Sequence, residues 1–285
     1  MKFENTQVMN FKGAFRGMRN PKESHHKSDS FFELVDYEYT EADYDIASIW
    51  AENEKPEYYE NFGDYEEERI KLEDKYDEWL LNNGVLYRND DDMIAEVAYI
   101  GPNDMKLAQT LIKAGPEHRK FMRQIFVSVD ITAPLYIWKE LDTYKVGTVA
   151  NSTSTMHKLT SKPITLDCFE IDDMPSSLKN WHDNVTGWDF DFNKVLSTQV
   201  SCLEGLRQKY LETKDIRYWK ELVRWLPESW LQTRTWTCNY EILLNICKQR
   251  KGHKLTEWKS FIQWARTLPY AQEFIFINEQ DKQEL

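Results

Sequence analysis

The stretch from Thr143 to Leu159, TYKVGTVANSTSTMHKL, holds small hydroxyl and amide side chains almost back to back. Side chains such as those of Thr148, Asn151 and Ser154 can donate and accept hydrogen bonds where a ligand approaches the backbone closely. They can also bond their own backbone in a solvated loop. Because the stretch follows a predicted strand, its density of polar groups favours a pocket lining.

A second set of side chains suited to a ligand lies near the carboxyl end of the chain. Arg250 ends an otherwise apolar helix face, and His253 and two lysines follow it within four residues. A guanidinium can pair with two phosphate oxygens at once, so Arg250 predicts a clamp for the phosphate of a nucleotide. The alternative is a cationic helix terminus stabilised by the helix dipole, with His253 as a surface residue.

Several other kinds of site are excluded by spacing. His25, His26 and His118 have no partner at metal-ligand spacing, so no metal site is expected. The sequence also lacks a Ser-His-Asp order, a P-loop and a G-x-G-x-x-G motif. The four cysteines have no C-x-x-C spacing, which indicates reduced thiols in a cytoplasmic protein. They are Cys168, Cys202, Cys238 and Cys247.

Composition indicates a globular protein, since the 285 residues are 41% hydrophobic and 29% charged. The amino terminus lacks the apolar core of a signal peptide, and no apolar run reaches membrane-spanning length, so no membrane partner is expected. The net charge of −12 arises in residues 33–78, where eighteen acidic and four basic side chains give −14. The remainder can accept an anion in a local pocket but has no basic stripe for nucleic acid.

Hydrophobic periodicity predicts the elements that position these side chains. Alternating apolar residues predict a half-buried strand over Gln124–Thr132. Periods of three and four predict helices at 103–115, 133–142, 193–214, 215–226, 239–250 and 256–268, and in the acidic segment at 64–84. Asn103 or Asp104 is expected to cap the helix at 103–115. A further helical stripe is formed by Val8, Phe11, Phe15 and Met18.

These elements predict an α+β fold. We expect one domain over residues 1–285, with a central antiparallel sheet packed by the tryptophan-rich carboxyl-terminal helices. Six of the eleven tryptophans fall between Trp219 and Trp264. Residues 33–90 are expected to form an acidic helical insertion or extension within the domain, with a solvated face.

The order of strand, Ala133-Pro134, helix and polar stretch resembles the flavin-dependent thymidylate synthase family. The signature of that family reads R-H-R-x-x-S-x-N-E-x-S-x-R-Y. Lys145 falls on its second arginine and Thr148 on its serine, and one inserted residue places Asn151 and Ser154 on its N-x-x-S. Near the other end, the family's N-x-R-x-L, L-R and H-A-Q-x-E elements are matched by Asn239, Arg250, His253 and Glu257. The resemblance covers residues 103–265.

The resemblance implies transfer of a one-carbon unit from methylene-tetrahydrofolate to C5 of a uracil nucleotide, dUMP to dTMP. Reduced flavin would supply the hydride, with FAD as cofactor and NADPH as a further cosubstrate. The family's sites form between subunits of a homotetramer. On the matching positions, the nucleotide would be bound by Arg250, Ser154, Lys145 and Thr148, and the cofactor by Asn151, His253, Asn239 and Tyr144. These side chains are expected to converge on one pocket, within a subunit or across an interface; no residue is assigned as catalytic.

Several signature positions differ in this chain. Thr143 and Tyr144 replace an arginine and a histidine, Glu140 replaces a glutamine, and Glu241 replaces the arginine that follows Asn239. In the family such positions hold the phosphates of the flavin and the nucleotide. Neither threonine nor a carboxylate reproduces a bidentate arginine, so weaker binding of a dinucleotide is expected.

Two alternatives therefore stay open. One is a related enzyme that modifies another pyrimidine nucleotide, for example by hydroxymethylation, in a bacterium or encoded by a bacteriophage. The other is a non-catalytic descendant that binds a nucleotide or only its own partners. A flavin spectrum would separate them, because the visible absorbance belongs to the cofactor.

Overall fold

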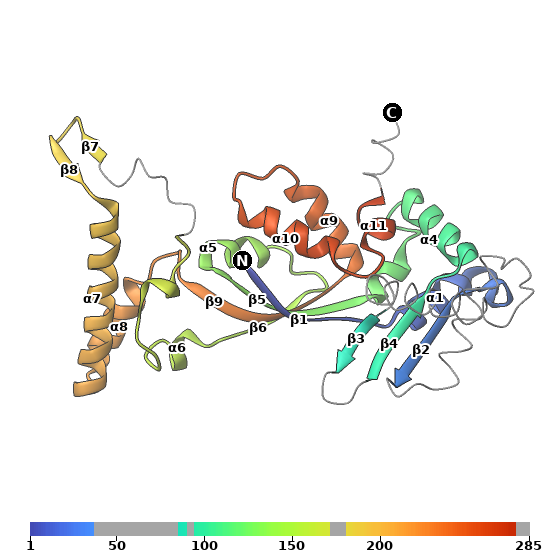
Figure 1. Ribbon diagram of the computed structural model, residues 1–285, viewed down its shortest axis with the longest axis horizontal. Coiled ribbons are helices and arrows are strands. Elements are labelled where there is room, and N and C mark those ends of the chain that lie inside the picture. The colour runs from blue at the N-terminus through green and yellow to red at the C-terminus, as the bar shows by residue number, and fades with distance from the viewer. Residues whose placement is uncertain (37–84, 90–93, 172–180, 278–285) are drawn as a thin grey trace, which may run out of the picture. The chain divides into compact units, whose positions relative to one another are not determined.

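The computed structural model describes residues 1–36, 85–89, 94–171 and 181–277, and they form the predicted α+β architecture (Figure 1). The central sheet has the strand order β1-β5-β9-β6. Side chains of β5 and β9 pair as Thr132 with Thr233 and as Ser128 with Thr237, so the two strands run antiparallel. The four strands are β1 Lys2–Met9, β5 Phe126–Pro134, β9 Leu231–Asn239 and β6 Val149–Ser152.

Two smaller antiparallel sheets accompany the central one. In the first, β4 pairs with β2 on one side and with β3 on the other. The second is a hairpin of β7 and β8. These strands are β2 Phe31–Asp36, β3 Val85–Asn89, β4 Ile94–Tyr99, β7 Trp181–Asp183 and β8 Trp188–Phe190. The acidic segment at 33–90 thus begins and ends in strands, while the helix predicted at 64–84 lies outside the described residues.

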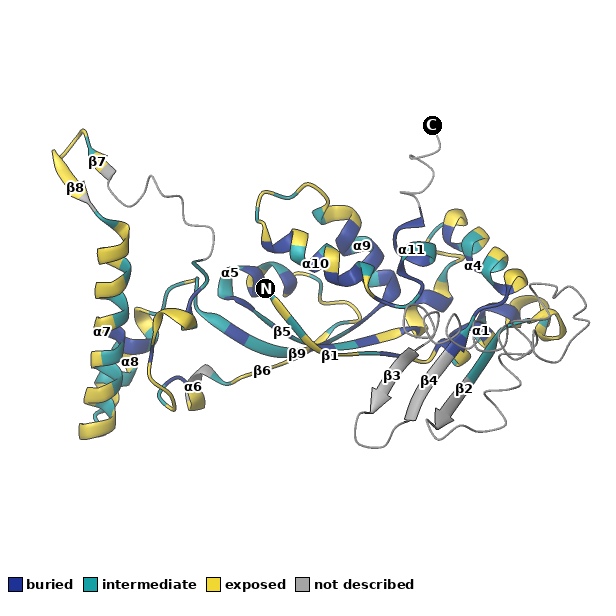
Figure 2. Ribbon diagram, in the orientation of Figure 1, coloured by how far each residue is buried: buried dark blue, intermediate teal, exposed yellow. Residues whose placement is uncertain are grey.

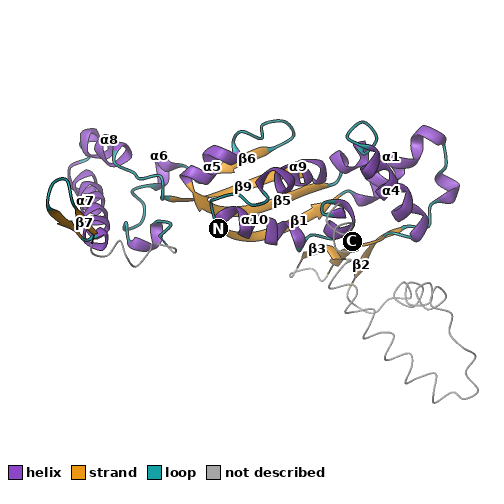
Figure 3. Cartoon of the chain, turned by 90° about the horizontal axis from the view of Figure 1, so that it is seen from above, coloured by secondary structure: helices purple, strands orange, loops and turns teal. Residues whose placement is uncertain are grey.

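Helices make up most of the remaining regular structure (Figure 3). All the helices predicted between residues 103 and 268 are present, with ends shifted by one or two residues. No helix in the described ranges is both long enough and apolar enough to cross a membrane. The helices are α1 Phe11–Arg19, α4 Pro102–Ala114, α5 Leu135–Leu141, α6 Thr155–Lys158, α7 Phe192–Thr213, α8 Ile216–Arg224, α9 Tyr240–Arg250, α10 Glu257–Arg266 and α11 Ala271–Phe274, with 3-10 turns η1 Asn20–Lys22, η2 His25–Lys27, η4 Lys120–Gln124 and η5 Leu166–Cys168.

The predicted strand at 124–132 is confirmed as β5, displaced toward its carboxyl end. Val127, Val129 and Ile131 are buried, whereas Phe126 on the other face is 41% exposed. This alternation buries one face of the strand and leaves the other face more exposed to solvent. Gln124 belongs to η4 instead of the strand.

Only β5 was predicted as a strand; the other strands in the described ranges were not, and among these are β1 and β9 of the central sheet. The helical stripe predicted through Val8 is wrong at that residue, because Val8 lies in β1 and the helix starts at Phe11.

In β9, buried Trp236 shares its face with Gln232 and Arg234, and these polar residues interrupt the expected alternation of apolar side chains. The Gln232 amide donates to the Thr153 backbone carbonyl, and Arg234 donates to Asp142, the residue after α5.

The chain divides into two compact units, one of residues 1–4 and 130–236 and one of residues 5–129 and 237–285. Strands β5 and β9 contribute residues to both units, and the single domain expected over 1–285 stays a prediction. In the second unit, rings from helices α1, α9 and α11 form an aromatic core. Phe11 lies 5.7 Å from Tyr240 and 6.5 Å from Phe274 between ring centroids. Ring pairs of this kind add to the stabilisation from burial.

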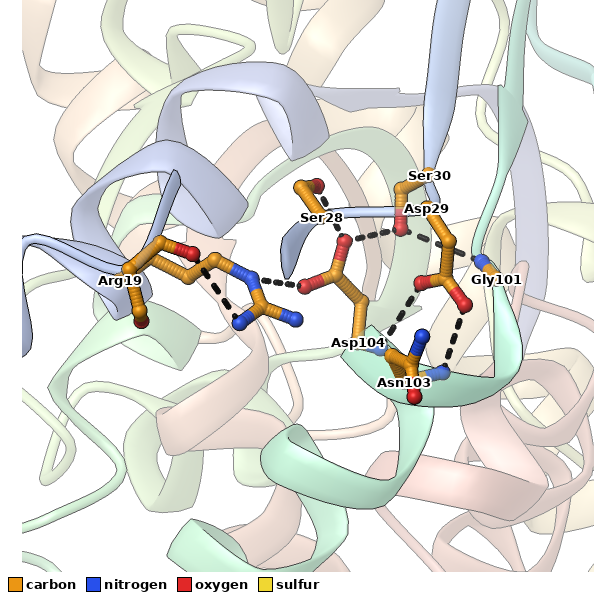
Figure 4. Close-up of polar contacts among 8 residues, drawn as sticks. Arg19, Ser28, Asp29, Ser30, Gly101, Asn103 and Asp104 are labelled. Atoms are coloured by element: carbon orange, nitrogen blue, oxygen red, sulfur yellow. Dashed lines mark hydrogen bonds and ion pairs between the residues drawn. The ribbon is translucent and has the colours of Figure 1, made fainter. Parts of the chain in front are cut away.

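The amino end of α4 is capped from a distant part of the chain (Figure 4). Asp29 accepts the backbone N–H groups of Asn103 at 2.8 Å and Asp104 at 3.0 Å. The predicted caps, Asn103 or Asp104, are therefore wrong; the N-cap position is Gly101. A Cβ on Gly101 would lie 2.2 Å from the Asp29 carbonyl oxygen, so the close approach requires glycine.

Asp104 instead forms the centre of a buried polar cluster (Figure 4). Its carboxylate accepts hydrogen bonds from Arg19 Nε at 2.5 Å, Ser28 Oγ at 2.5 Å and Ser30 Oγ at 2.6 Å. The Asp104 side chain is 0% exposed and that of Arg19 is 6% exposed. A charge this deeply buried is tolerated because it is paired and hydrogen-bonded.

The first unit contains a smaller apolar cluster beneath α7 and α8. Leu203 of α7 packs with Leu222 of α8 and with Phe169, while the outer side of α7 is exposed (Figure 2). Glu204 of α7 accepts the N–H of Ile164, which lies between α6 and η5, and so joins these parts of the chain. Its carboxylate also accepts a bidentate contact from Arg207 on the same helix. Hydrogen bonds from Arg207 lower the pKa of Glu204 to about 2.

Candidate functional site

The polar stretch lies in the first unit, where the chain leaves α5, turns, runs as β6 and enters α6. Gly147 makes the turn with φ of 77°, a conformation that favours glycine. Strand β6 is an edge strand of the central sheet, and all four of its residues are exposed. Part of the predicted polar loop is therefore an edge strand.

Two hydroxyl groups of the stretch bond to the backbone close by. Thr148 Oγ1 donates to the carbonyl of Tyr144, and Ser154 Oγ accepts the N–H of His157 at 3.3 Å, at the start of α6. These contacts stabilise the turn and the short helix. They are the kind of local side-chain to backbone bond expected if the stretch is a solvated loop and not a pocket lining. The assignment of Thr148, Ser154 and Tyr144 to a ligand stays a prediction.

Lys145 and Asn151 present their donors at the surface of the stretch. Both are exposed, and within the described part of the chain neither side chain has a hydrogen bond or an ion pair. An ammonium and a primary amide offer three and two N–H donors, respectively. These donors suit an anionic or carbonyl-bearing ligand.

An arginine that the sequence did not single out fixes the sheet against α5. Arg234 donates to the carboxylate of Asp142 at 2.9 Å and to Oε1 of Gln232 at 3.0 Å, and its guanidinium carbon lies 4.3 Å from the Trp138 ring centroid. Trp138 in turn donates to the Gln232 carbonyl at 2.8 Å. These contacts hold the end of α5, from which the polar stretch starts. The separation of Arg234 and Asp142 by 92 residues hides the contact from local patterns.

Arg250 ends α9 in the second unit, stacked on a buried indole. Its guanidinium carbon lies 4.6 Å from the ring centroid of Trp258, and Trp258 is 0% exposed. Stacking fixes the plane of the guanidinium and directs its N–H groups sideways from the ring. The side chain is thus oriented by the protein before any ligand binds.

His253 shares this indole. Its ring centroid lies 6.2 Å from that of Trp258, and its Nδ1 accepts the N–H of Leu255 at 3.2 Å. With Nδ1 as acceptor, the neutral ring carries its proton on Nε2 and can act as a donor there. Gly252, with φ of 74°, makes the turn that brings His253 back to Trp258. Arg250 and His253 are therefore brought together by one aromatic ring.

Asn239 lies at the opposite end of α9 from Arg250. Its side-chain oxygen accepts the N–H of Ile242 at 3.1 Å and caps the helix. Eleven helical residues separate the two ends, a length of about 16 Å. One mononucleotide does not reach both, and the assignment of Asn239 to the cofactor stays a prediction.

Glu241 in the first turn of α9 is neutralised by a distant arginine. Arg119 Nε and Nη2 donate to its two carboxylate oxygens at 2.7 and 3.1 Å. The two side chains are only 12% and 8% exposed. The Glu241 carboxylate, which was expected to weaken binding of a dinucleotide, is thus part of a bidentate ion pair.

One thiol of the described residues lies in a fully buried position. Burial, and then the neighbouring Cys247, raise the pKa of the Cys238 thiol well above its ordinary value, so it stays protonated at neutral pH. Cys238 lies in β9, and Cys247 lies in α9. Across the described ranges, no group of three histidine, cysteine or acidic side chains is placed to hold a metal ion.

The predicted site residues are divided between the two units. Tyr144, Lys145, Thr148, Asn151 and Ser154 belong to the first, and Asn239, Arg250 and His253 to the second. Their convergence on one pocket stays a prediction.

No family model matches the chain, and no curated protein matches it. Among solved structures, it is similar to a flavin-dependent thymidylate synthase, ThyX, from Helicobacter pylori complexed with FAD and dUMP. The TM-score is 0.43 and the identity 17%, over 86% of this chain and 97% of the other. A second structure of the Helicobacter pylori enzyme with FAD and dUMP has a TM-score of 0.44, with the same identity and coverage.

A third similar structure is the UMP/dUMP methylase PolB from Streptomyces cacaoi bound with 5-Br UMP. Its TM-score is 0.41 and its identity 14%, over 60% of this chain and 84% of the other. These values are too low to carry a function from one protein to another.

Proposed function

We propose that the chain binds a uracil mononucleotide and that Arg250 holds its phosphate. The observation that carries this proposal is the stacking of Arg250 on buried Trp258, beside His253. An arginine already fixed in one orientation loses less side-chain entropy when it binds an anion. Lys251 and Lys254 add positive charge at the same turn.

The fuller reaction implied by the sequence resemblance is one-carbon transfer from methylene-tetrahydrofolate to C5 of dUMP, giving dTMP. It requires a flavin, which would supply the hydride when bound. In the family signature, arginines hold the phosphates. Here Thr143 stands at one of those positions, where its hydroxyl donates to the Glu140 carbonyl. Glu241 stands at another, where Arg119 binds it.

A dinucleotide flavin held as the signature holds it does not fit these residues. Nucleotide binding is therefore the part of the function that the side chains support best. One-carbon transfer, or hydroxymethylation, with a flavin bound differently is the second candidate. The exposed donors of Lys145 and Asn151, at matching signature positions, favour it.

Calorimetric titration with dUMP tests the first proposal. Arg250→Ala is expected to weaken binding by about 1.5–3 kcal/mol, roughly 10- to 150-fold, because a charge-assisted hydrogen bond to phosphate is lost. Arg266→Ala is the matched control, since Arg266 also stacks on a ring, 4.0 Å from the Phe276 centroid. Absence of dUMP binding by the wild type, or equal affinity in Arg250→Ala, contradicts the proposal.

Absorbance near about 450 nm, where an oxidised flavin absorbs, tests the second candidate. An enzyme of this kind is expected to bring flavin with it through purification or to take it up on addition of FAD or FMN. A colourless protein that binds dUMP but no flavin would contradict the second candidate and would leave nucleotide binding as the only proposed function. A homotetramer, which the resemblance implies, is proposed with this candidate and is checked by light scattering.

A further inference from the structure

We propose that Glu241 fills, with its own carboxylate, the anion position offered by Arg119 at the start of α9, so that the chain holds no flavin phosphate there. This inference deepens the proposed function and rests on it, because it restricts the ligand to a nucleotide whose single phosphate is bound at Arg250. The chain has replaced a ligand's anion with an internal one.

The geometry of the pair carries the first step. The fork of Arg119 approaches Glu241 through Nε and Nη2, one nitrogen to each oxygen, at 2.7 and 3.1 Å. This parallel arrangement is the one that a guanidinium uses for two phosphate oxygens. A phosphate at the same fork would have to displace the carboxylate.

Burial makes this displacement unfavourable. Glu241 is 8% and Arg119 is 12% exposed at the side chain, so water screens the pair little. A displaced Glu241 would remain beside the incoming phosphate as a second, unpaired negative charge at a position with little access to solvent. Removing one partner of a buried pair is strongly unfavourable for this reason.

The position of Glu241 in the helix adds to the effect. It is the second residue of α9, directly after Asn239 and Tyr240, where the helix dipole favours a negative charge. Arg119 reaches it from the turn after α4, 122 residues earlier. Helix dipole and guanidinium therefore both stabilise the same internal carboxylate.

Glu241→Gln is the decisive variant, because the amide keeps the size of the side chain and removes its charge. FAD, FMN and inorganic pyrophosphate are the probes, followed by calorimetry and, for the flavins, by fluorescence polarisation. The wild type is expected to bind FAD and pyrophosphate at least tenfold more weakly than Glu241→Gln does. The double variant Arg119→Gln/Glu241→Gln is expected to lose the gain, because the guanidinium is absent.

Glu204→Gln is the matched control. It removes a carboxylate from another bidentate arginine pair, but one made within a helix, three residues apart, and away from a helix start. No gain of flavin or pyrophosphate affinity is expected from it. If Glu241→Gln does not fold, Glu241→Asp is the test variant. Its shorter side chain loosens the contact with the Arg119 guanidinium, so a smaller gain in affinity for FAD and pyrophosphate is expected.

Three results overturn the inference: equal FAD affinity in the wild type and Glu241→Gln, no gain in any folded Glu241 variant, or a gain that survives loss of Arg119. Titration of each variant with dUMP separates this failure from that of the proposed function. If dUMP binds with an affinity that depends on Arg250, but flavin affinity is unchanged by substitution of Glu241, only the further inference fails. If dUMP does not bind at all, the proposed function fails.

Discussion

The cluster around Asp104 and the stretch from Thr143 to Ser154 use polar side chains in opposite ways. In the first, residues from distant parts of the chain meet around one fully buried carboxylate (Figure 4). In the second, neighbours in sequence stay at the surface and bond mainly to local backbone. The residues that look most like a site in sequence are thus the less tightly organised set.

The difference has a physical cause. A buried charge must be fully paired, so Asp104 draws Arg19, Ser28 and Ser30 into fixed positions. Exposed hydroxyls are satisfied by water or by the nearest carbonyl and impose little order. We therefore expect substitutions in the Asp104 cluster to affect folding, and substitutions in the 143–154 stretch to affect ligand binding.

The largest expected effect is that of Arg19→Met. It leaves the Asp104 carboxylate buried without its counter-ion, which typically costs about 3–5 kcal/mol in the free energy of unfolding. Urea unfolding followed by tryptophan fluorescence measures it. Arg16→Met, an exposed arginine on the same helix, is the control and should change stability by less than about 0.5 kcal/mol. Equal effects of the two substitutions would remove the contrast between the regions.

Glu204→Gln tests an ion pair of intermediate exposure and should cost about 1–2 kcal/mol at neutral pH, because the carboxylate accepts several hydrogen bonds. The pKa of Glu204 is lowered from 4.5 to about 2 in the folded chain. Its contribution is therefore complete above about pH 4.5 and is lost as the pH falls toward about 2. Unfolding curves of wild type and variant should converge over that window. A constant difference down to pH 2.5, within that window, would contradict the assignment.

Asp29→Ala should have a smaller effect, about 0.5–2 kcal/mol, since it removes the cap of α4 and leaves its first N–H groups without their acceptor. Asp29→Asn keeps an acceptor oxygen and should recover much of the loss. Thermal unfolding by circular dichroism compares the two. A loss in Asp29→Asn as large as in Asp29→Ala would mean that the charge, and not the hydrogen bonds, stabilises the helix.

The smallest change in stability is expected for Lys145→Ala and Asn151→Ala, within about 0.5 kcal/mol, because both residues are exposed. If the stretch lines the nucleotide pocket, these variants should bind dUMP several-fold more weakly without a shift in melting temperature. Unchanged affinity with unchanged stability would leave the stretch as a solvated edge of the sheet.

Sequence patterns predicted the parts of this fold that depend on near neighbours. The helices at 192–213 and 240–250 and strand β5 follow from the period of their apolar residues. Strand β9 was not predicted because Gln232 and Arg234 occupy its inward positions. Their partners are far away in sequence: the Gln232 amide donates to the Thr153 backbone carbonyl, and Arg234 donates to the Asp142 carboxylate. The cap of α4 by Asp29 was not predicted for the same reason, because Asp29 lies 74 and 75 residues from the two residues whose N–H groups it accepts.

The candidate site shows the same limit. The sequence singled out Arg250 by its type and its place at a helix end, and His253 by the family resemblance, but it did not single out the indole of Trp258 that lies against both. The fork between Arg119 and Glu241 joins residues 122 positions apart, and no local period marks it. Residue types therefore indicated which groups are available, while three-dimensional contacts decide which of them are already occupied.

The pairing of β2 with β4 and the cap that Asp29 places on α4 depend on each other. Residues 28–36 and 94–104 contact each other directly, from Phe31 opposite Tyr99 to Asp36 opposite Ile94. A slip of β2 along β4 by one residue would move Asp29 by about 3.3 Å. That shift would take its carboxylate out of hydrogen-bond reach of the Asn103 and Asp104 N–H groups. The start of a helix thus helps to set the register of a sheet that it does not belong to.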